Sequence, residues 1–488
     1  MSTKTEIIAW FEGHRRDVYE PGTVRMEALL ERLDHPERRL KFVHIAGTNG
    51  KGSTLAFLQS ILRAAGYDVG AYISPHVTTY ESRIQLNGEP IDEAGLAFVY
   101  ETLRPHAEAL AATPLGAPTE FELLTAAAIV YFAKRAYPDI VLFETGLGGR
   151  LDSTNVVYPL VSVITSIGFD HIRLLGSTLA AIAREKAGII KSGVPVVTTR
   201  QDAEAMRVIR DTAKAKRADL YALDERFWVE DPRIGPSGQS LSVRTPHRLY
   251  PGLRLGMRGV HQFENAALAV MAAELLRLYY AFDIEDEHVR EGLLRAENPG
   301  RMELFEGPGG VNIVLDGAHN ESGMRQFAAS LEALCPAARR VAVFAAMKDK
   351  DHRAMLSHLL PHIEALVVTT VDLPRAENPA VLSEEARMIR PELPIYIQQA
   401  PPQALEAALR IASKAANRIA DESAPNTASS GKADGAVLRT EAEAGAEGTR
   451  AMVAVTGSLY LIQAVRPTVI EAFPALGAGA ATGAHSDR

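Results

Sequence analysis

The feature that most constrains the fold is a regular alternation of short apolar runs with amphipathic stretches between residues 40 and 199. Apolar runs of roughly four to eight residues favour buried strands, and longer stretches with apolar residues at helical spacing favour helices. The predicted strands are 41–45, 69–73, 139–143, 161–165 and 194–198, and the predicted helices are 53–65, 121–136 and 178–191. Strands and helices in this order build a mostly parallel sheet that is covered on both faces, so we expect an α/β fold.

The alternation pauses after residue 199 and resumes after residue 300. Residues 219–259 are rich in turn residues and predict a small β excursion, and two helices are expected after it, at 261–280 and 286–294. Further strands are then predicted at 311–315, 341–345, 365–369 and 451–456.

The chain has 488 residues, which at roughly 150 residues per domain allows two or three domains. We predict an N-terminal domain over residues 1–297 and a smaller C-terminal α/β domain over residues 298–488, because the segment Asn298-Pro-Gly-Arg301 is typical of a boundary. Residues 421–450 lack apolar periodicity and predict a flexible insertion, and residues 474–488 predict a disordered tail.

Composition excludes several classes of protein. Lys and Arg total 52 and Asp and Glu total 60, and the net charge of −8 argues against a protein that coats nucleic acid, which needs a basic face. The single cysteine, Cys335, excludes an internal disulfide and a Cys-based zinc site, and it is expected to be a small core residue. Runs of about 20 apolar residues are absent, so no membrane span is expected. With one thiol and no signal peptide, the chain is expected to be cytoplasmic.

A glycine-rich loop follows the first predicted strand and precedes the first predicted helix of the alternation. It reads Gly47-Thr48-Asn49-Gly50-Lys51-Gly52-Ser53. Glycines let backbone N–H groups turn toward an anion, the next helix presents its positive end, and Lys51 would neutralise phosphate charge. The strict phosphate-loop pattern requires Gly where Ile45 stands and Ser or Thr where Gly52 stands, so this loop is a variant. The alternative is an ordinary strand–helix turn with an exposed lysine.

Polar residues follow two further predicted strands. Glu144 comes directly after the strand 139–143, and Asp170 and His171 follow the strand 161–165. Because the carboxyl ends of parallel strands meet at one edge of a sheet, Glu144 is well placed to hold Mg²⁺ near nucleotide phosphates. Taken alone, His171 is more simply a loop histidine, and Glu185 and Lys186 are more simply a solvated helix face.

Seven segments in chain order resemble one known family. They are Gly47 to Ser53, Glu144-Thr-Gly-Leu-Gly-Gly-Arg-Leu-Asp-Ser-Thr-Asn155, Phe169-Asp-His171, Arg184-Glu-Lys-Ala-Gly-Ile189, His261-Gln-x-x-Asn265, Pro299-Gly-Arg301 and Asp316-Gly-Ala-His-Asn320. The set is similar to folylpolyglutamate synthase and the bifunctional dihydrofolate synthase–folylpolyglutamate synthase, which belong to the Mur-ligase superfamily of ATP-dependent, amide-forming ligases. The resemblance covers about residues 20–465 without 421–450. It implies an N-terminal P-loop ATPase domain and a smaller Rossmann-like C-terminal domain.

The resemblance also implies the ligands. ATP is expected in the cleft between the domains, bound by Gly47, Thr48, Asn49, Gly50, Lys51, Gly52, Ser53, Asn265, Arg301 and Asp316. Two Mg²⁺ sites are implied, one with Ser53 and Glu144 and the other with Glu144 and His171. Lys186 matches a lysine that is carbamylated in the superfamily, and a carbamate would give a metal-rich site an anion in place of a cation, so Lys186 is also expected among the metal-site residues. Lys51, Lys186, His171 and Arg301 are the expected catalytic residues.

The resemblance is less complete on the side of the folate substrate. The expected substrate-binding residues are Ser74, Pro75, His76, Arg83, Glu122 and His319, with Gly22 to Met26 and Phe121 as further candidates. The family usually has Glu-Arg-Ile where this chain has Ser82-Arg83-Ile84, with Glu81 one place earlier. Glu122 has an alternative role, because Thr119-Glu-Phe-Glu122 matches a helix capping box. Residues 346–351 resemble a family loop that lines the glutamate or nucleotide side.

The implied reaction adds L-glutamate to a folate, or to dihydropteroate, through an acyl phosphate. We expect small-molecule substrates, no nucleic-acid or membrane partner, and a monomer. Two alternatives stay open: a Mur-type ligase with another peptide or acid acceptor, and a nucleotide-binding module that has lost catalysis. The second usually lacks metal ligands or the carbamylated lysine, whereas Ser53, Glu144, His171 and Lys186 are all present.

Overall fold

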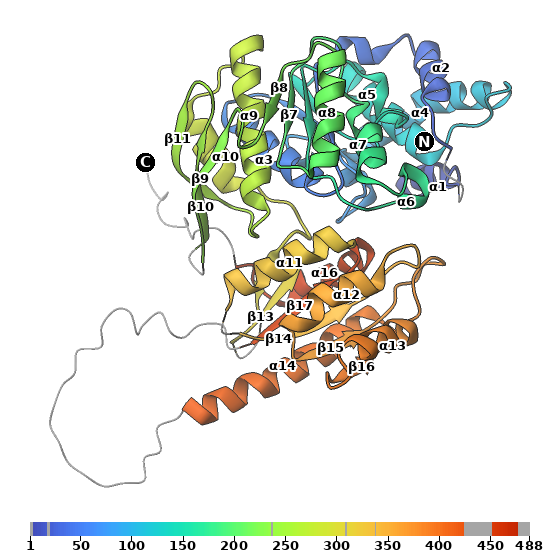
Figure 1. Ribbon diagram of the computed structural model, residues 1–488. Coiled ribbons are helices and arrows are strands. Elements are labelled where there is room, and N and C mark those ends of the chain that lie inside the picture. Colours follow the sequence, from blue (N-terminus) through green and yellow to red (C-terminus); the bar gives the residue numbers. More distant parts are fainter. Residues whose placement is uncertain are drawn as a thin grey trace, which may run out of the picture. The chain divides into compact units, whose positions relative to one another are not determined.

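The computed structural model describes residues 3–16, 20–235, 238–307, 310–336, 338–423 and 451–476. The chain divides into two compact units, the first ending at Pro299 and the second beginning at Gly300, with short pieces at Ile234 and Arg258–Val260 counted with the second. Figure 1 labels many of the elements of both units. Within the described residues, no helix is long and apolar enough to cross a membrane.

The first unit is built on an eight-stranded sheet with the order β4-β3-β2-β5-β1-β6-β7-β8. The strands are β1 (Phe42–Ala46), β2 (Val69–Tyr72), β3 (Ile84–Leu86), β4 (Glu89–Pro90), β5 (Ile140–Glu144), β6 (Val161–Ile164), β7 (Val196–Thr198) and β8 (Leu220–Ala222). The six strands from β2 to β8 in this order pair in parallel, which confirms the predicted sheet. The strands β3 and β4 are an antiparallel edge. Asn87 and Gly88 form the turn of this hairpin, and both have positive φ. An Asn-Gly pair is a local signal for such a turn, although this hairpin was not predicted.

Helices cover both faces of this sheet (Figure 1). They are α1 (Lys4–Glu12), α2 (Val24–Arg32), α3 (Lys51–Ala64), α4 (Glu93–Ala111), α5 (Glu120–Tyr131), α6 (Ile172–Leu175), α7 (Leu179–Ala187), α8 (Ala203–Ala215), α9 (Gln262–Tyr280) and α10 (Asp286–Arg295). The side chains of Phe42 and Phe143 enter the core formed with α1, α2, α4 and α5. On the other face α3 packs against α9 and α10. The buried α5 begins at Thr119 with the predicted capping box, which is confirmed.

The predicted β excursion forms a separate three-stranded sheet of β9 (Trp228–Gly235), β10 (Gly238–Arg244) and β11 (Leu249–Leu255). Its strands β10 and β11 are antiparallel. The excursion is shorter than predicted, because β8 belongs to the main sheet, where it pairs in parallel with β7.

The second unit has a six-stranded sheet with the order β12-β13-β17-β14-β15-β16. The strands are β12 (Glu303–Glu306), β13 (Val311–Leu315), β14 (Arg339–Phe344), β15 (Ala365–Val368), β16 (Ile395–Ile397) and β17 (Ala451–Thr456). All pair in parallel except β12, which is antiparallel to β13 and was not predicted. Residues 474–476 extend this edge, since Leu476 N–H donates to Leu304 O at 2.8 Å.

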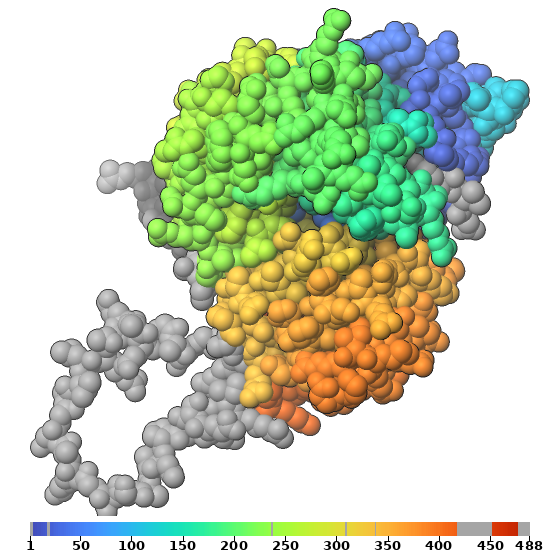
Figure 2. Space-filling model, viewed as in Figure 1, coloured from blue at the N-terminus to red at the C-terminus, as the bar shows by residue number. Residues whose placement is uncertain are grey.

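The helices of the second unit are α11 (Glu321–Leu334), α12 (His352–Leu359), α13 (Pro379–Ile389), α14 (Pro401–Ser423) and α16 (Leu459–Ala472). The first three pack along one another, and their surface is the yellow-to-orange part of Figure 2. On the other face α14 packs on β14 and β17. Cys335 is half-buried at the end of α11, against this unit's core. Of the stretches predicted to be flexible, residues 424–450 and 477–488 lie outside the described residues, whereas residues 421–423 end α14 and residues 474–476 pair with β12.

Candidate active site

The glycine loop lies in the predicted place, between β1 and α3, and its backbone is tightly enclosed. Gly47 and Gly50 have φ of 154° and 89°, values that L side chains rarely adopt. A Cβ at Gly47 would lie 1.8 Å from Thr165 Oγ1, and one at Gly50 would lie 2.4 Å from Asn265 Oδ1. The loop therefore passes against the end of β6 and the first turn of α9 with no room for side chains at either glycine.

Polar contacts fix the loop to the segment that follows β6. Thr48 Oγ1 exchanges hydrogen bonds of 3.1 Å with the backbone N–H and carbonyl of Gly168, and Thr48 N–H donates to Ser166 O at 2.8 Å. Because α3 begins at Lys51, the N–H groups of its first turn have no earlier carbonyl of the same helix to bond. The loop and this helix end together have the geometry that favours binding of an anion.

Lys51 and Glu144 face each other beside this loop. Lys51 Nζ lies 3.7 Å from Glu144 Oε1 and donates to Thr48 O at 3.5 Å. Glu144, the last residue of β5, is 5% exposed, and its Oε2 accepts from Ser74 N–H at 3.3 Å. The structure thus brings the predicted phosphate-binding lysine, the predicted metal-binding carboxylate and the predicted substrate loop together.

Ser53 lies in the first turn of α3 and is held by two amides. Its Oγ accepts from Gln262 Nε2 at 3.4 Å and from Asn298 Nδ2 at 3.3 Å. The same Gln262 accepts from Asn265 Nδ2 at 2.9 Å through its Oε1. Gln262 and Asn298 were not predicted as site residues, although both stand inside or beside the motifs quoted above.

Lys186 approaches the glycine loop from α7. Its side chain is buried, and Nζ donates to Gly47 O at 2.7 Å. Burial lowers the pKa of Lys186 to about 7, and the positive charge of Lys51 acts in the same direction. A buried amine of this kind is far less basic than a surface lysine, so the solvated helix face is the wrong interpretation of this position.

His171 lies at the start of α6 with φ of 49°, and its N–H donates to Asp170 Oδ1 at 2.8 Å. Its ring Nε2 is 3.9 Å from the same carboxylate oxygen. Across the described ranges, no cluster of three or more His, Cys, Asp or Glu side chains could hold a metal ion on its own.

The predicted substrate loop after β2 is tied together by its own polar side chains. Arg83 Nε donates to His76 Nδ1 at 3.0 Å, and the Arg83 guanidinium lies 5.5 Å from the centre of the Tyr80 ring. Burial lowers the pKa of His76 to about 4, and Arg83 contributes to the shift. His76 is therefore neutral at pH 7, with its proton assigned to Nε2 because Nδ1 is an acceptor.

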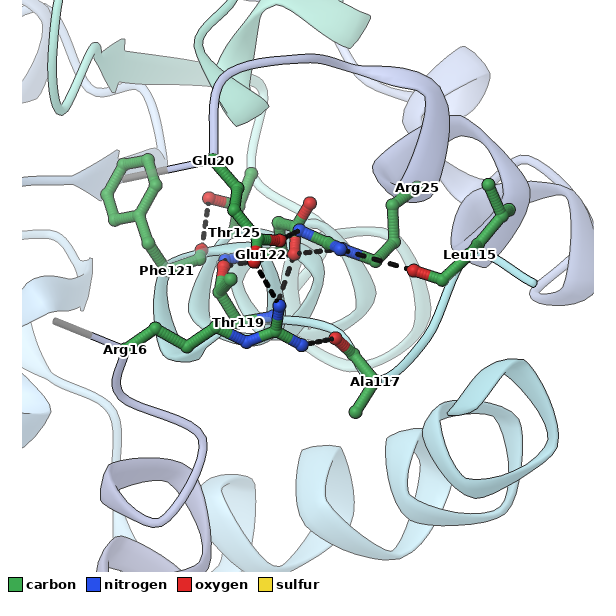
Figure 3. Close-up of polar contacts among 9 residues, drawn as sticks. All are labelled: Arg16, Glu20, Arg25, Leu115, Ala117, Thr119, Phe121, Glu122 and Thr125. Carbon is green, nitrogen blue, oxygen red and sulfur yellow. Dashed lines mark hydrogen bonds and ion pairs between the residues drawn. The ribbon is translucent and has the colours of Figure 1, made fainter. Parts of the chain in front are cut away.

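Glu122 is buried, with 3% of its surface exposed, and its side chain accepts hydrogen bonds from other residues of the chain. Its Oε2 accepts from Thr119 N–H at 2.7 Å and from Arg25 Nε at 2.8 Å (Figure 3). The neighbouring Phe121 packs against the loop after β5, since a Cβ at Gly146 would lie 2.4 Å from its ring. The capping interpretation of Glu122 is thus confirmed, and an ion pair with Arg25 is added to it.

In the second unit, three predicted residues gather where β13 ends. Asp316 accepts from Met302 N–H and from Ala318 N–H, each at 2.9 Å. A Cβ at Gly317 would lie 3.1 Å from a guanidinium nitrogen of Arg301. His319 Nδ1 donates to Gly317 O at 2.8 Å. Arg301, Asp316 and His319 therefore belong to one local site on this unit.

Asp152 is a buried residue that the sequence analysis did not select. Its Oδ2 accepts from Leu147 N–H at 2.8 Å, and its Oδ1 accepts from Thr154 N–H at 3.0 Å and from Thr154 Oγ1 at 2.6 Å. His44 Nε2 lies 2.8 Å from the same Thr154 hydroxyl. Burial raises the pKa of Asp152. The carboxylate holds the glycine-rich loop after β5, and its place inside Gly-Leu-Gly-Gly-Arg-Leu-Asp152 was the signal that could have identified it.

Comparison with known proteins gives consistent results for both units. Residues 45–273 match the family described as "Mur ligase middle domain", and residues 300–419 match "Mur ligase, glutamate ligase domain". The chain is 44% identical over 369 residues to a dihydrofolate synthase/folylpolyglutamate synthase of Bacillus subtilis, a match that covers 75% of this chain and 85% of the relative. It is 32% identical to a folylpolyglutamate synthase of Lacticaseibacillus casei, covering 76% of this chain and 86% of that one.

Solved structures resemble the fold over nearly the whole chain. A Mycobacterium tuberculosis folylpolyglutamate synthase complexed with ADP and AMPPCP has a TM-score of 0.82 at 28% identity, covering 95% of this chain and 97% of that chain. E. coli FolC in complex with DHPP and ADP has a TM-score of 0.79 at 26% identity, covering 96% and 98% respectively.

Proposed function

The chain belongs to the Mur ligase family as an ATP-dependent, amide-forming ligase, and we propose that it adds L-glutamate to reduced folates and to dihydropteroate. The observation that carries the proposal is the convergence at the glycine loop, where Lys51 faces Glu144 and the amine of Lys186 bonds to Gly47. Relatives and solved neighbours named as folate enzymes support the choice of acceptor.

Nucleotide phosphates are proposed to bind along the glycine loop 47–53. Backbone N–H groups at the start of α3 and the ammonium of Lys51 supply positive charge where the β- and γ-phosphates require it. Asn265 is proposed to contact the nucleotide from the first unit, and Arg301 and Asp316 are proposed to do so from the second. Solved neighbours complexed with ADP and AMPPCP support the assignment.

The donor atoms beside the loop fit Mg²⁺. Glu144 and Ser53 offer hard oxygen ligands, and Glu144 Oε2 lies only 3.8 Å from the position that a Cβ of Gly52 would occupy. Because few protein carboxylates converge here, phosphate oxygens and water would complete the coordination, which is how Mg²⁺ commonly binds in such enzymes. When bound, Mg²⁺ would neutralise phosphate charge. As part of the same proposal, Glu144 and His171 would hold a second ion.

Lys186 is proposed to carry a carbamate. The reaction needs a neutral amine, whose nitrogen bonds to the carbon of CO₂ and then loses a proton, and a pKa of about 7 makes that form abundant at neutral pH. In ¹³C NMR after equilibration with ¹³C-bicarbonate, the wild-type protein should give a carbamate signal that Lys186→Met lacks. Identical spectra for the two proteins would exclude the modification.

The proposed chemistry has two steps. An oxygen of the acceptor carboxylate attacks the γ-phosphorus of ATP and the bond to the β–γ bridging oxygen breaks, which gives an acyl phosphate and ADP. The amine of glutamate then attacks the acyl carbon, loses a proton and expels phosphate. Lys51 holds the phosphate charge in the first step, and Arg301 is proposed to assist it.

The acceptor is proposed to bind beside Ser74, Pro75, His76 and Arg83. Neutral His76 offers an Nε2–H donor, and Arg83 offers a positive charge for a carboxylate. His319 and residues 346–351 are proposed to bind the glutamate side from the second unit.

The decisive test is ADP release with Mg-ATP and L-glutamate, compared for dihydropteroate and tetrahydrofolate as acceptors. Stimulation by both would support the bifunctional enzyme, and stimulation by tetrahydrofolate alone would leave a polyglutamylating enzyme. Bound ATP without stimulation by either would exclude the folate assignment and favour a peptide acceptor.

A further inference from the structure

Six charged side chains form two ion-paired groups around the first turn of α5, Arg15 with Glu120 and Arg16–Glu20–Arg25–Glu122, and we call the two groups together the anchor network. Its members are Arg15, Arg16, Glu20, Arg25, Glu120 and Glu122. Its arginines and glutamates are paired with one another, so the network neutralises its own charge. The network can therefore affect a neighbouring site by holding segments of the chain in position, and not by adding a net charge.

Glu120 joins two segments that are far apart in sequence. It accepts from Arg15 through both oxygens, at 2.7 Å from Nε and 3.0 Å from the terminal nitrogen, and it also accepts from Tyr80 OH at 3.1 Å. The side chain is 12% exposed, so these bonds are largely shielded from water. The bond to Glu120 is the largest cause that raises the pKa of Arg15. Tyr80 in turn packs edge-on against His76, in the loop proposed to bind the acceptor.

Glu122 ties down the other side of the same turn. Arg25 donates to Glu122 at 2.8 Å, to Glu20 at 2.9 Å and to Leu115 O at 3.2 Å (Figure 3). Arg16 donates to Glu20 at 2.6 Å and to Ala117 O. Arg25 thus connects the start of α2, the segment before it and the loop that leads into α5.

Phe121 stands between the two glutamates, and its ring fills the space that a Cβ of Gly146 would need. On the same side, Gly22 N–H donates to Leu151 O at 3.1 Å, so the segment before α2 also touches the loop after β5. The first turn of α5 is therefore the point at which residues 14–16, residues 20–25, the 74–83 loop and the loop after β5 are held together.

We propose that Glu120 and Glu122 are positioning residues for the acceptor substrate, because they hold residues 14–16, residues 20–25 and the 74–83 loop in place at the first turn of α5. This inference rests on the proposed function, since it takes those segments as the acceptor side of the site. It also assigns Glu122 a role through Arg25 rather than through contact with substrate.

The nucleotide side is held by other contacts. Thr48 is bonded to Gly168 and Ser166, and Gly47 is bonded to Lys186. Loosening the anchor network should therefore change binding of the acceptor and leave binding of ATP nearly unchanged.

The test compares Glu122→Gln and Glu120→Gln with the wild-type enzyme. Glutamine also serves at the third position of a capping box, so Glu122→Gln keeps the start of α5 while it removes the charge that Arg25 faces. We expect the KM for tetrahydrofolate to rise at least about tenfold and the KM for ATP to stay within about twofold, because loosened acceptor-binding segments weaken ground-state binding of the acceptor alone. Arg25→Lys should behave like Glu122→Gln, because lysine keeps the charge but cannot form the guanidinium fork.

The matched control is Glu108→Gln, which removes a carboxylate from an exposed i,i+4 pair with Arg104 on α4. It should leave both KM values unchanged. Hydrogen exchange at residues 20–25 and 112–118 should speed up in Glu122→Gln and not in the control, which reports the loosening without any substrate.

The outcomes separate the two proposals. Failure of the wild-type enzyme to release ADP with either acceptor would overturn the proposed function and this inference with it. An active wild type whose Glu120→Gln and Glu122→Gln variants keep the acceptor KM would overturn the positioning role alone. An equal rise in both KM values would also overturn it, since that result indicates general damage to the fold.

Discussion

At the scale of single residues, two lysines and one carboxylate of the first unit gather at the glycine loop. Lys51 faces Glu144 at 3.7 Å, and Lys186 bonds to the backbone of the same loop at 2.7 Å. Burial and the positive charge of Lys51 lower the pKa of Lys186, which favours its neutral amine. Lys51 is the positive charge left to face an anionic ligand at this loop.

The first prediction concerns Glu144. In Glu144→Ala, kcat should fall at least about a hundredfold, roughly 2.7 kcal/mol of transition-state stabilisation, because the oxygen donor opposite Lys51 is removed. Lys51→Ala should have an effect of similar size. The measurement is kcat in the ADP-release assay with folding checked by circular dichroism, and Glu108→Ala is the control. A folded Glu144→Ala protein with near-full activity would show that the proposed metal ligand is wrongly assigned.

The second prediction concerns His44 and pH. Burial lowers the pKa of His44 to about 3, and Lys191 adds to the shift. The unfolded chain binds this proton near pH 6.5 and the folded chain does not, so stability is complete above pH 6.5 and falls as the pH drops toward 3. This residue alone should remove about 1.4 kcal/mol of unfolding free energy per pH unit in that window.

The check is urea denaturation of wild type and His44→Gln between pH 6.5 and pH 5. The variant is expected to be less stable at pH 7, since it disturbs the bond to Thr154, but its stability should fall less steeply with decreasing pH. Parallel stability curves for the two proteins would mean that His44 is not held neutral by the fold.

At the scale of elements, the site is made at junctions between a strand and the next helix. The glycine loop, Glu144 and the segment 165–171 each follow a parallel strand, so their polar groups meet at one edge of the sheet. The antiparallel edges behave differently, since β3 pairs with β2 and β4, and β12 pairs with β13, without a crossover helix. They widen each sheet and supply none of the glycine-loop contacts described above.

The third prediction separates steric enclosure from backbone strain at one such junction. Gly50 and Gly66 have nearly equal φ, 89° and 86°, but only a Cβ at Gly50 meets another atom, Asn265 Oδ1 at 2.4 Å. Both alanine variants should lose about 1 kcal/mol of stability through strain. Only Gly50→Ala should also weaken AMPPCP binding, by at least about tenfold or 1.4 kcal/mol. Equal affinities of the two variants in isothermal titration calorimetry would contradict the close packing at Gly50.

At the scale of the whole molecule, each unit has its own hydrophobic core. The first unit is centred on α5 and the strands β1 and β5, and the second on α11, α12 and β14. Separate cores allow each unit to unfold with its own temperature dependence. The predicted ATP-binding residues are also divided between the units, because the glycine loop lies in the first unit and Arg301 and Asp316 lie in the second.

The fourth prediction follows from these separate cores. Differential scanning calorimetry should resolve two transitions, and Mg-AMPPCP at about a hundred times its Kd should stabilise the first unit by about 2.7 kcal/mol. Hydrogen exchange would assign that transition, because β1 and β5 should gain more protection than β14 and β17. The shift should disappear in Lys51→Ala. A single transition that moves as a whole in both proteins would show that the units do not unfold separately.

The parallel sheets, the position of the glycine loop and the polar residues at strand ends follow from the amino-acid sequence alone. These features depend on local signals: runs of apolar residues, glycines at positive φ, and the rule that parallel strands present their carboxyl ends at one edge. For the same reason the structure places Lys51, Glu144 and Ser74 together, as their motifs suggested.

Tertiary packing sets which polar side chains meet across long stretches of chain. Arg25 and Glu122 are 97 residues apart, and Ser53 and Gln262 are 209 apart, so neither contact leaves a pattern in the local sequence. The burial that makes Lys186 a weak base is likewise a property of the assembled core and not of its helix. Desolvation and pairing depend on what the fold packs against a group, and that is why the amino-acid order identified the residues of the site but not their environment.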